Sequence, residues 1–334
     1  MTNILIVGLG LIGGSFAKAL SGFPNATVYG LDIDENVIAQ AEADGAIAKG
    51  VCEADAILPK MDIVILCVTP KAAVDFINTK TFQKGALVTD VCGVKGMMFA
   101  EIKNDDIDYI GGHPMAGREC DGYENSTGDL FRGANYIMVT KESNSVEHIQ
   151  ILQDIIKYIG CTKITRTTSK EHDVMIAYTS QLMHVVAATL CDNEILDRAE
   201  GFSAGSLRDC TRVAKLNPKM WAELFVENRE ALSEQIDIFT ASLKKIEMMI
   251  KNSDVSGIED FLTVTCERKK TVSGRKRKTV IAEGSYMKQY DLVVIGGGFA
   301  GTAVPIAKKD CVQLTAVNID KPRKTLKQNG AFCG

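Results

Sequence analysis

A glycine-rich segment near the start of the chain limits the fold more than any other feature. Gly8, Gly10 and Gly13 have GxGxxG spacing, directly after the apolar run ILIV and at the start of a helical stretch. The first glycine permits a tight turn, the second lets a phosphate approach the backbone, and the third lets the helix pack on the strand. The N–H groups of Leu11 and Ile12 at the helix start can then face the phosphates. This pattern predicts the first strand, turn and helix of a dinucleotide-binding sheet.

The end of the second expected strand indicates which dinucleotide binds. That strand ends at Asp32, and a carboxylate in this position accepts hydrogen bonds from ribose hydroxyls and repels a 2′-phosphate. A glycine turn that only packs a helix on a strand would not need an acidic residue there. The sequence therefore predicts NAD rather than NADP as the cofactor.

The first half of the chain alternates short β-branched runs with helical stretches, which is typical of a parallel sheet with crossover helices. The expected strands are 4–8, 27–32, 62–68, 86–91, 108–114, 135–140 and a short last one at 163–165. From these we predict an α/β fold whose N-terminal domain, residues 1–167, is a Rossmann-type doubly wound parallel sheet that binds NAD.

The pattern changes to helices at Thr168. Thr168 and Glu171 have capping-box spacing, and an apolar helical pattern then continues to about Leu196. Further helices are expected at 203–215, 219–250 and 257–270, the last with Ser256 and Glu259 in capping positions. Residues 168–270 are therefore predicted to form an all-helical domain.

Two segments follow the predicted helical domain. Residues 271–286 are rich in Lys and Arg and are interpreted as a basic linker, with a nucleic-acid patch as the less favoured alternative. Residues 287–334 contain DLVVIGGGFAGTA, in which Gly296, Gly298 and Gly301 resemble the glycine turn of a flavin-dependent oxidoreductase. Little chain follows, and Pro305 lies in the expected helix. We interpret this extension as a truncated second nucleotide-binding motif.

Composition argues against several classes of partner. The chain has 42 acidic and 38 basic residues, a balance that does not indicate nucleic acid or a membrane surface. No apolar run is expected to reach the roughly 18 residues of a membrane span, and no signal peptide is recognised, so a cytoplasmic protein is predicted. The 10 cysteines have no metal-ligand spacing, so no metal is expected.

Motifs in both predicted domains resemble the prephenate dehydrogenase family. They are GLGLIGGS at 8–15, CVTP at 67–70, TDVCGVKG at 89–96, GGHPMAGRE at 111–119, HDVMIAYTSQLMH at 172–184 and SLRDCTRVA at 206–214. The resemblance covers about residues 1–270. It implies NAD-dependent oxidative decarboxylation of prephenate to 4-hydroxyphenylpyruvate in tyrosine biosynthesis. It also implies that Val68, Thr69 and Pro70 line the cofactor site.

The resemblance implies that His113 is the general base for the ring hydroxyl of the substrate. A neutral imidazole near its ordinary pKa of about 6.5 would suit that task. Arg212 is implied as the anchor of a substrate carboxylate, and Arg208, four residues earlier on the same helical face, would shape the pocket. His172 and Asp173 also match the family, and we interpret them chiefly as a polar pair at the domain junction.

Ser180 and His184 share a face of the long helix, and the resemblance gives them substrate-side roles. Three positions depart from the family, and at one of them Met183 stands where relatives carry a proline. Gln181 stands where relatives carry a histidine, and Gly93 stands where relatives often carry a serine that helps to orient the nicotinamide or the substrate hydroxyl. This chain has neither side chain available for those roles.

The long helix predicts a homodimer. Its segment VMIAYTSQLMHVVAATL is apolar almost all round, so one nucleotide-binding domain can cover only part of it. A second copy could cover the rest through a symmetric contact, and relatives pair through this domain. The second domain is therefore predicted to be a helical dimerisation domain. Glu119, in the loop after His113, would then reach the substrate pocket of the neighbouring copy.

Three other functions remain open from the sequence. Arogenate dehydrogenase has the same chemistry on an aminated side chain, and the sequence separates it poorly from prephenate dehydrogenase. The other two are a non-catalytic NAD-binding sensor, against which His113 and Arg212 argue, and a different hydroxyacid dehydrogenase. The combination of GGHPMAG and RDCTR argues against the last of these.

Overall fold

The computed structural model describes residues 1–118, 120–202, 204–274, 292–294 and 303–305. The chain divides into two units, Met1–Phe261 and Leu262–Gly334. Glu119, most of the predicted basic linker and the glycines at 296, 298 and 301 lie outside the described residues.

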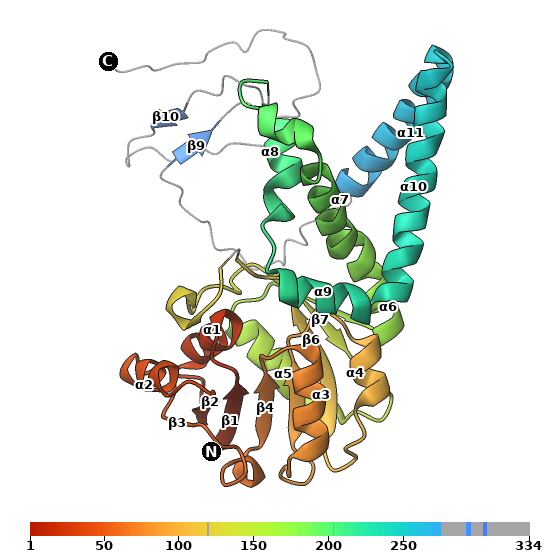
Figure 1. Ribbon diagram of the computed structural model, residues 1–334. Helices are drawn as coiled ribbons and strands as arrows, with labels where there is room; N and C mark the ends of the chain where they lie inside the picture. The colour runs from red at the N-terminus through yellow and green to blue at the C-terminus, as the bar shows by residue number, and fades with distance from the viewer. Residues whose placement is uncertain (119, 203, 275–291, 295–302, 306–334) are drawn as a thin grey trace, which may run out of the picture. The chain divides into compact units, whose positions relative to one another are not determined.

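The N-terminal part of the first unit is an eight-stranded sheet (Figure 1). Its strands are β1 (Thr2–Val7), β2 (Ala26–Leu31), β3 (Lys49–Val51), β4 (Ile63–Leu66), β5 (Leu87–Asp90), β6 (Asp108–Pro114), β7 (Asn135–Val139) and β8 (Lys163–Thr167). They are ordered β3-β2-β1-β4-β5-β6-β7-β8. The predicted Rossmann-type α/β fold is confirmed, and the sequence missed only the short strand β3.

One strand pair departs from the predicted parallel arrangement. β6 and β7 pair antiparallel, whereas all other neighbours in this sheet are parallel. A parallel return needs a crossover, usually a helix. The connection between β6 and β7 contains only the short 3-10 turn η2 (Tyr123–Asn125) among its described residues. The chain therefore comes back in the opposite direction.

Alternating residues of each central strand face opposite sides of the sheet. In β1, Ile4 and Ile6 enter one buried apolar cluster, and Leu5 and Val7 enter the other. Helices α1 (Leu11–Leu20), α2 (Glu35–Ala43) and α5 (Val146–Tyr158) contribute to the first cluster. Helices α3 (Pro70–Thr79) and α4 (Gly96–Glu101) contribute to the second. The two layers of helices hold the strand ends, and the loops that follow them, in place.

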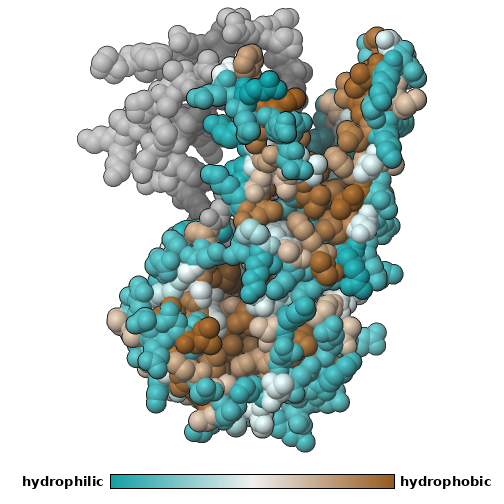
Figure 2. Space-filling view, viewed as in Figure 1, coloured by the Kyte–Doolittle hydropathy of each residue, from teal (hydrophilic) through white to brown (hydrophobic). Residues whose placement is uncertain are grey.

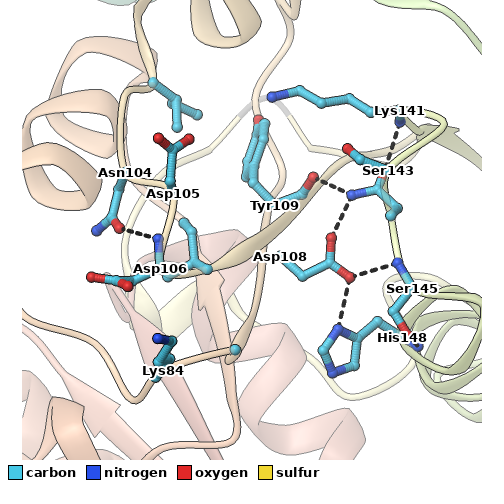
Figure 3. A pocket seen from close by; sticks show the side chains of 14 residues that line it. Lys84, Asn104, Asp105, Asp106, Asp108, Tyr109, Lys141, Ser143, Ser145 and His148 are labelled. Atoms are coloured by element: carbon cyan, nitrogen blue, oxygen red, sulfur yellow. Dashed lines mark hydrogen bonds and ion pairs between the residues drawn. The ribbon is translucent and has the colours of Figure 1, made fainter.

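Strand β6 is anchored at its start, far from the residues that follow its carboxyl end. Figure 3 shows a pocket of about 530 Å³ around Asp108. The Asp108 carboxylate accepts hydrogen bonds from Asn144 Nδ2 at 2.5 Å and Ser145 N at 2.9 Å, and it contacts His148 Nδ1 at 2.8 Å. These bonds tie β6 to the start of α5. They therefore help to fix the start of the strand that carries His113.

The second part of the first unit is helical, as predicted. It contains α6 (Ser169–Ile176), a π-helical turn η3 (Ala177–Gln181), α7 (Leu182–Cys191), η4 (Glu194–Arg198), α8 (Gly205–Thr211), η5 (Arg212–Ala214), α9 (Pro218–Glu227), α10 (Arg229–Lys251) and the start of α11 (Val255–Gly274). The predicted long helices are shorter or broken. The first ends at Cys191 rather than Leu196, and the stretch 219–250 is two helices separated by Asn228.

The two predicted helix caps have different outcomes. Thr168 Oγ1 accepts a hydrogen bond from Glu171 N at 3.2 Å, so the first cap is confirmed. The predicted cap at Ser256 is wrong. Asp254 caps that helix instead, because its carboxylate accepts from Gly257 N at 2.9 Å and the helix already includes Val255.

The apolar run in Ser169–Cys191 is longer than the sequence suggested. By length and composition alone, this helical stretch could cross a membrane, so the expectation that no run reaches that length is wrong. The reason is that α6, the π-helical turn and α7 continue one another without a break. A core helix of a soluble protein passes the same test.

The described part of the second unit contains the end of α11 and two short strands. β9 (Leu292–Val294) and β10 (Ala303–Pro305) pair antiparallel. The strand predicted at the start of the extension is therefore present. The helix expected around Pro305 is not, because Pro305 belongs to β10 and pairs with Leu292.

Candidate active site

The glycine turn after β1 leaves room for a ligand at one position and none at the other two. A Cβ on Gly13 would lie 1.8 Å from the carbonyl oxygen of Gly8, and one on Gly8 would lie 2.7 Å from the carbonyl oxygen of Cys67. A Cβ on Gly10 would meet nothing within 4 Å. Gly10 is also the N-cap of α1, with no side-chain capping bond, so the helix start at Leu11 stays open to a phosphate. The turn fits a dinucleotide.

Asp32 lies directly after β2, where the sequence places it. Its carboxylate accepts hydrogen bonds from Leu9 N at 2.7 Å and Asp34 N at 3.0 Å, which hold it beside the glycine turn. The surrounding potential is negative. The pKa of the Cys52 thiol is raised, first by desolvation and then by the negative charges of Glu35 and three other carboxylates, one of which is Asp32. A 2′-phosphate would meet this negative charge, whereas ribose hydroxyls could donate to it.

The segment that follows β4 lies against the same turn. A Cβ on Gly8 would come within 2.8 Å of Val68 Cγ1, so Val68 closes one side of the turn. Thr69 is the N-cap of α3 and Pro70 is its first residue. The structure therefore brings the predicted cofactor residues together at the carboxyl ends of β1, β2 and β4, where ligands bind in open α/β sheets.

His113 lies near the end of β6 and contacts the helical part of the unit. Its Nδ1 lies 2.9 Å from Nε2 of His172, and Nδ1 of His172 lies 2.7 Å from Oδ1 of Asp173. Asp173 in turn accepts hydrogen bonds from the backbone N–H groups of Lys95 at 2.8 Å and Gly96 at 2.6 Å. The pair interpreted as a polar junction therefore joins the two parts and also contacts His113. The sequence did not indicate that second contact.

The pKa of His113 departs from the ordinary value on which the sequence argument relied. Burial lowers it well below 6.5, and the positive charge of Lys95 and the neighbouring His172 act in the same direction. Burial also lowers the pKa of His172, although its hydrogen bond to Asp173 opposes the shift. Both imidazoles are therefore neutral near pH 7, as a general base requires.

A fully buried ion pair lies beside His113. Lys95 Nζ is 2.8 Å from Asp90 Oδ1, and neither side chain is exposed. Lys95 Nζ also donates to the carbonyl oxygen of Cys92 at 2.6 Å, and Asp90 Oδ2 accepts from the Tyr109 hydroxyl at 2.6 Å. Sequence reasoning missed this pair. The available signal was an acid and a base within the otherwise apolar and small residues of TDVCGVKG.

His184 lines a second pocket, of about 500 Å³. Its ring stacks on Trp221 with centroids 3.9 Å apart, and its Nδ1 lies 2.9 Å from the carbonyl oxygen of Ser180. Ser180 thus holds the His184 ring through its backbone. The described residues that line this pocket are Arg118, Cys120, Asp121, His184, Val213, Lys215, Leu216, Asn217, Pro218, Met220 and Trp221. Trp221 was not predicted, although it is the one tryptophan of the chain.

The two predicted arginines occupy different elements. Arg212 begins the 3-10 turn η5 and precedes Val213, which lines the pocket of His184. Arg208 lies on α8, its side chain is 82% exposed, and it pairs with the adjacent Asp209 at 3.8 Å. α8 ends at Thr211, so the two arginines lie on consecutive helical segments rather than on one regular helix.

Comparison with known proteins agrees with this geometry. The nucleotide-binding domain of prephenate dehydrogenase matches residues 16–165, and the dimerization domain of prephenate dehydrogenase matches residues 168–264. The chain belongs to the prephenate dehydrogenase family.

Two curated members of the family are 30% identical to this chain. Prephenate dehydrogenase from Lactococcus lactis aligns over 313 residues, which cover 88% of this chain and 82% of that protein. Cyclohexadienyl dehydrogenase from Zymomonas mobilis aligns over 263 residues, which cover 75% of this chain and 89% of that protein.

Solved structures show the same fold. A crystal structure of prephenate dehydrogenase from Aquifex aeolicus, in complex with hydroxyphenyl propionate and NAD+, is 29% identical with a TM-score of 0.71. The match covers 81% of this chain and 98% of that one. Arogenate dehydrogenase from Synechocystis has a TM-score of 0.70 at 24% identity, a likeness that concerns the fold alone.

The lowered pKa values of the two contacting histidines predict that stability depends on pH. Between the ordinary imidazole pKa of about 6.5 and the lower values in the folded protein, the unfolded chain binds more protons. We therefore expect the free energy of unfolding to decrease as pH falls below about 6.5, by up to about 1.4 kcal/mol per pH unit for each histidine. Urea unfolding at a series of pH values measures this.

A variant with both His113→Gln and His172→Gln provides the control, since its unfolding should lose this part of the pH dependence. An equal slope for the parent and the double variant between pH 5 and about pH 6.5 would contradict the assignment.

Proposed function

We propose that this protein catalyses the NAD-dependent oxidative decarboxylation of prephenate to 4-hydroxyphenylpyruvate. The observation that carries the proposal is the position of His113. A partly buried imidazole with a lowered pKa lies at the carboxyl end of the sheet, on the same side as a glycine turn that fits a dinucleotide. Family membership supports the substrate, because curated relatives are prephenate and cyclohexadienyl dehydrogenases.

The cofactor site is proposed to consist of Gly8, Gly10, Leu11, Ile12 and Gly13 for the diphosphate, Asp32 for the adenosine ribose, and Val68, Thr69 and Pro70 beside them. When bound, NAD supplies an oxidised nicotinamide ring that accepts a hydride from the substrate carbon bearing the hydroxyl. The protein must hold the substrate next to that ring and control the hydroxyl proton.

His113 is proposed to hold that proton only temporarily. As the hydride leaves, Nε2 takes the hydroxyl proton and the ring carbon becomes a carbonyl. Loss of carbon dioxide then sends the electron pair of the broken carbon–carbon bond through the ring to this oxygen. The oxygen takes the proton back and becomes the phenol hydroxyl. Because no proton is gained or lost overall, a base with a low pKa is suitable, since it returns the proton readily.

The substrate carboxylates are proposed to bind at the pocket lined by His184. Arg212 adjoins this pocket through Val213, and a guanidinium group suits a carboxylate. Lys215 and Arg118 add positive charge to its lining. Ser180 would act through the carbonyl that holds His184.

Arg208 and Glu119 are the remaining predicted substrate residues. Arg208 is highly exposed on α8, so we assign it a supporting role at the pocket edge rather than direct contact with substrate. Glu119 is proposed to reach the substrate pocket of a neighbouring copy, on the family resemblance alone.

Arogenate is the second candidate substrate. It carries an ammonium group in place of the keto group of prephenate, and Asp121 lines the same pocket as His184. The Asp121 carboxylate receives only a long hydrogen bond, 3.4 Å from Asn217 Nδ2 among the described residues, so it retains capacity to accept one from an ammonium group. The two substrates are separated by measuring NADH formation with each of them side by side.

The domain division that accompanies this proposal is 1–167 for cofactor binding and 168–270 for substrate binding and dimerisation. Residues 271–286 are proposed as a linker and 287–334 as an extension without a catalytic role. We also propose that the enzyme acts in the cytoplasm.

Replacement of His113 by asparagine tests the catalytic assignment. Asparagine keeps polarity and approximate size but cannot take the proton, so kcat with prephenate should fall roughly 100-fold or more while NAD binding is retained. Stopped-flow or steady-state NADH absorbance measures kcat, and fluorescence titration measures NAD binding. An asparagine variant within a few fold of the parent would show that another group takes the proton.

Replacement of Asp32 by serine tests the cofactor assignment. Loss of charged hydrogen-bond acceptors should weaken NAD binding by about tenfold or more, and loss of negative charge should improve the use of NADP. The ratio of kcat/KM values for the two cofactors is the measurement. Asp55→Ser, which removes the same charge from an exposed residue paired with Lys80, is the control and should leave the ratio unchanged. Equal use of both cofactors by the unmodified protein would refute the assignment.

The helical domain presents apolar surface that supports a homodimer. Figure 2 shows this surface over α7 and α10. Large apolar side chains remain exposed there, among them Met183 at 43%, Ile238 at 57% and Leu243 at 56%. The matching family domain is a dimerization domain, so we propose a second copy of this chain rather than a membrane as the cover.

Leu243→Glu is expected to weaken the dimer, because a carboxylate would be buried at the contact. Light scattering at micromolar concentration should give about twice the chain mass for the parent and a shift toward one chain mass for Leu243→Glu. Lys244→Glu, next to it on α10, is the control. A stable monomeric parent, or recovery of the parent with membranes, would contradict the proposed contact.

A further inference from the structure

The hydrogen bonds behind His113 form a continuous chain that ends on the backbone of the sheet domain. The chain runs from His113 Nδ1 to His172, from His172 to Asp173, and from Asp173 to two backbone amides. We propose that His172 and Asp173 are positioning residues that keep His113 in the tautomer with a hydrogen on Nδ1 and a lone pair on Nε2. This inference rests on the proposed function only in assigning a catalytic purpose to that tautomer.

The direction of the hydrogen bonds is set at Asp173. Lys95 N donates to Oδ1 at 2.8 Å and Gly96 N donates to Oδ2 at 2.6 Å. Backbone amides can only donate, so both carboxylate oxygens act as acceptors and the ionised form is favoured. The third contact, from His172 Nδ1 at 2.7 Å, is therefore donated by the imidazole ring. The hydrogen of His172 is placed on Nδ1.

The tautomer of His172 then determines which ring donates in its hydrogen bond with His113. Burial lowers the pKa of His172, so its ring is neutral near pH 7 and carries one hydrogen. That hydrogen is on Nδ1, so Nε2 carries a lone pair and can accept a hydrogen bond. The contact of 2.9 Å to His113 Nδ1 must then be donated by His113. Because the pKa of His113 is also lowered, its own Nε2 has no hydrogen. Among the described residues, no hydrogen bond engages this nitrogen, and it is the one that can accept the substrate proton.

Residues of the helical part of the unit therefore orient the imidazole ring of His113, which belongs to the sheet. His172 and Asp173 lie on α6, and Asn228 fixes α6 from the other side by donating to the carbonyl oxygen of Asp173 at 3.0 Å and to Gln181 Oε1 at 2.6 Å. Gly96 allows the close approach, since a Cβ there would lie 2.7 Å from Asp173 Oδ2. The base is therefore fixed in its working form only while α6 is docked against residues 95 and 96.

The tautomer can be measured without any catalytic turnover. The chain has 4 histidines, so 15N spectra of labelled imidazoles in the full-length protein can be assigned with single His→Gln variants. We expect the parent to show a protonated Nδ1 and an unprotonated Nε2 at His113. Asp173→Asn should populate the reversed tautomer, because a carboxamide with its NH2 at the Oδ1 position donates to His172 Nδ1, and either orientation of the carboxamide leaves one of the two backbone N–H groups without an acceptor. A protonated Nε2 in the parent would overturn the proposal whatever the enzyme's substrate.

Kinetic measurements then separate positioning from simple structural support. Asp173→Asn should lower kcat with prephenate by on the order of 10³ to 10⁴, as the corresponding change does in serine-protease triads, with the KM values for NAD and prephenate within a few fold. His172→Gln should retain kcat within about tenfold, because its carboxamide can accept from His113 and donate to Asp173. His172→Leu can do neither and should lose roughly 100-fold or more.

Equal losses for His172→Gln and His172→Leu, with both variants folded by circular dichroism, would overturn the positioning role. So would an Asp173→Asn variant with the reversed tautomer and the kcat of the parent. If the parent shows the expected tautomer but oxidises neither prephenate nor arogenate, the proposed function fails and the structural assignment stands.

Discussion

The buried ion pair between Lys95 and Asp90 is the interaction on which the site depends. It joins the end of β5 to the turn before α4, and Asp90 also accepts from the backbone N–H of Cys92 at 2.7 Å. A buried pair of charges is tolerated only when hydrogen bonds satisfy both partners, and removal of one partner costs roughly 3–5 kcal/mol. Here the Cys92 carbonyl and the Tyr109 hydroxyl provide those bonds. The pair therefore holds the turn whose amides fix Asp173.

Besides burial, the same ion pair contributes to the electrostatics around the base. The ammonium group of Lys95 disfavours a second positive charge nearby, so it lowers the pKa of both His113 and His172. Asp90 and Asp173 bring negative charge to the site, and they oppose this shift at His172. Burial is thus the main cause of the lowered pKa of His113, and the charge of Lys95 adds to it. Placing the charge behind the base, rather than beside the substrate, leaves Nε2 open.

Much of this architecture could be predicted from the sequence, because its signals are local. The glycine turn, the acid at position 32 and the strand ending in His113 each follow from a few adjacent residues. The antiparallel β6–β7 pair and the break at Asn228 could not be predicted in this way. Asn228 is buried and bridges α6 to the π-helical turn, and only tertiary contacts show why a helix should be interrupted there.

Sequence reasoning missed the contacts that depend on distant partners. Lys95 and Asp173 are separated by 78 positions along the chain, and nothing in either segment indicates that one holds the other. The end of the regular helix one residue before Arg212 could not be predicted either. Periodicity predicts a shared face only while the helix continues.

Two of the departures from the family, at Gly93 and Gln181, are consistent with orientation of His113 from behind. Gly93, where a serine is often found, has Leu224 as its nearest neighbour, at 3.6 Å from the place of a Cβ. A side chain would fit there without moving the backbone, so steric exclusion does not explain the glycine. Gln181 replaces an imidazole, yet it is buried and bonded to Leu224 O and Asn228, so its role is to dock the helices. With both those groups absent, the chain through His172 and Asp173 is the means of orientation that the described residues provide for the base.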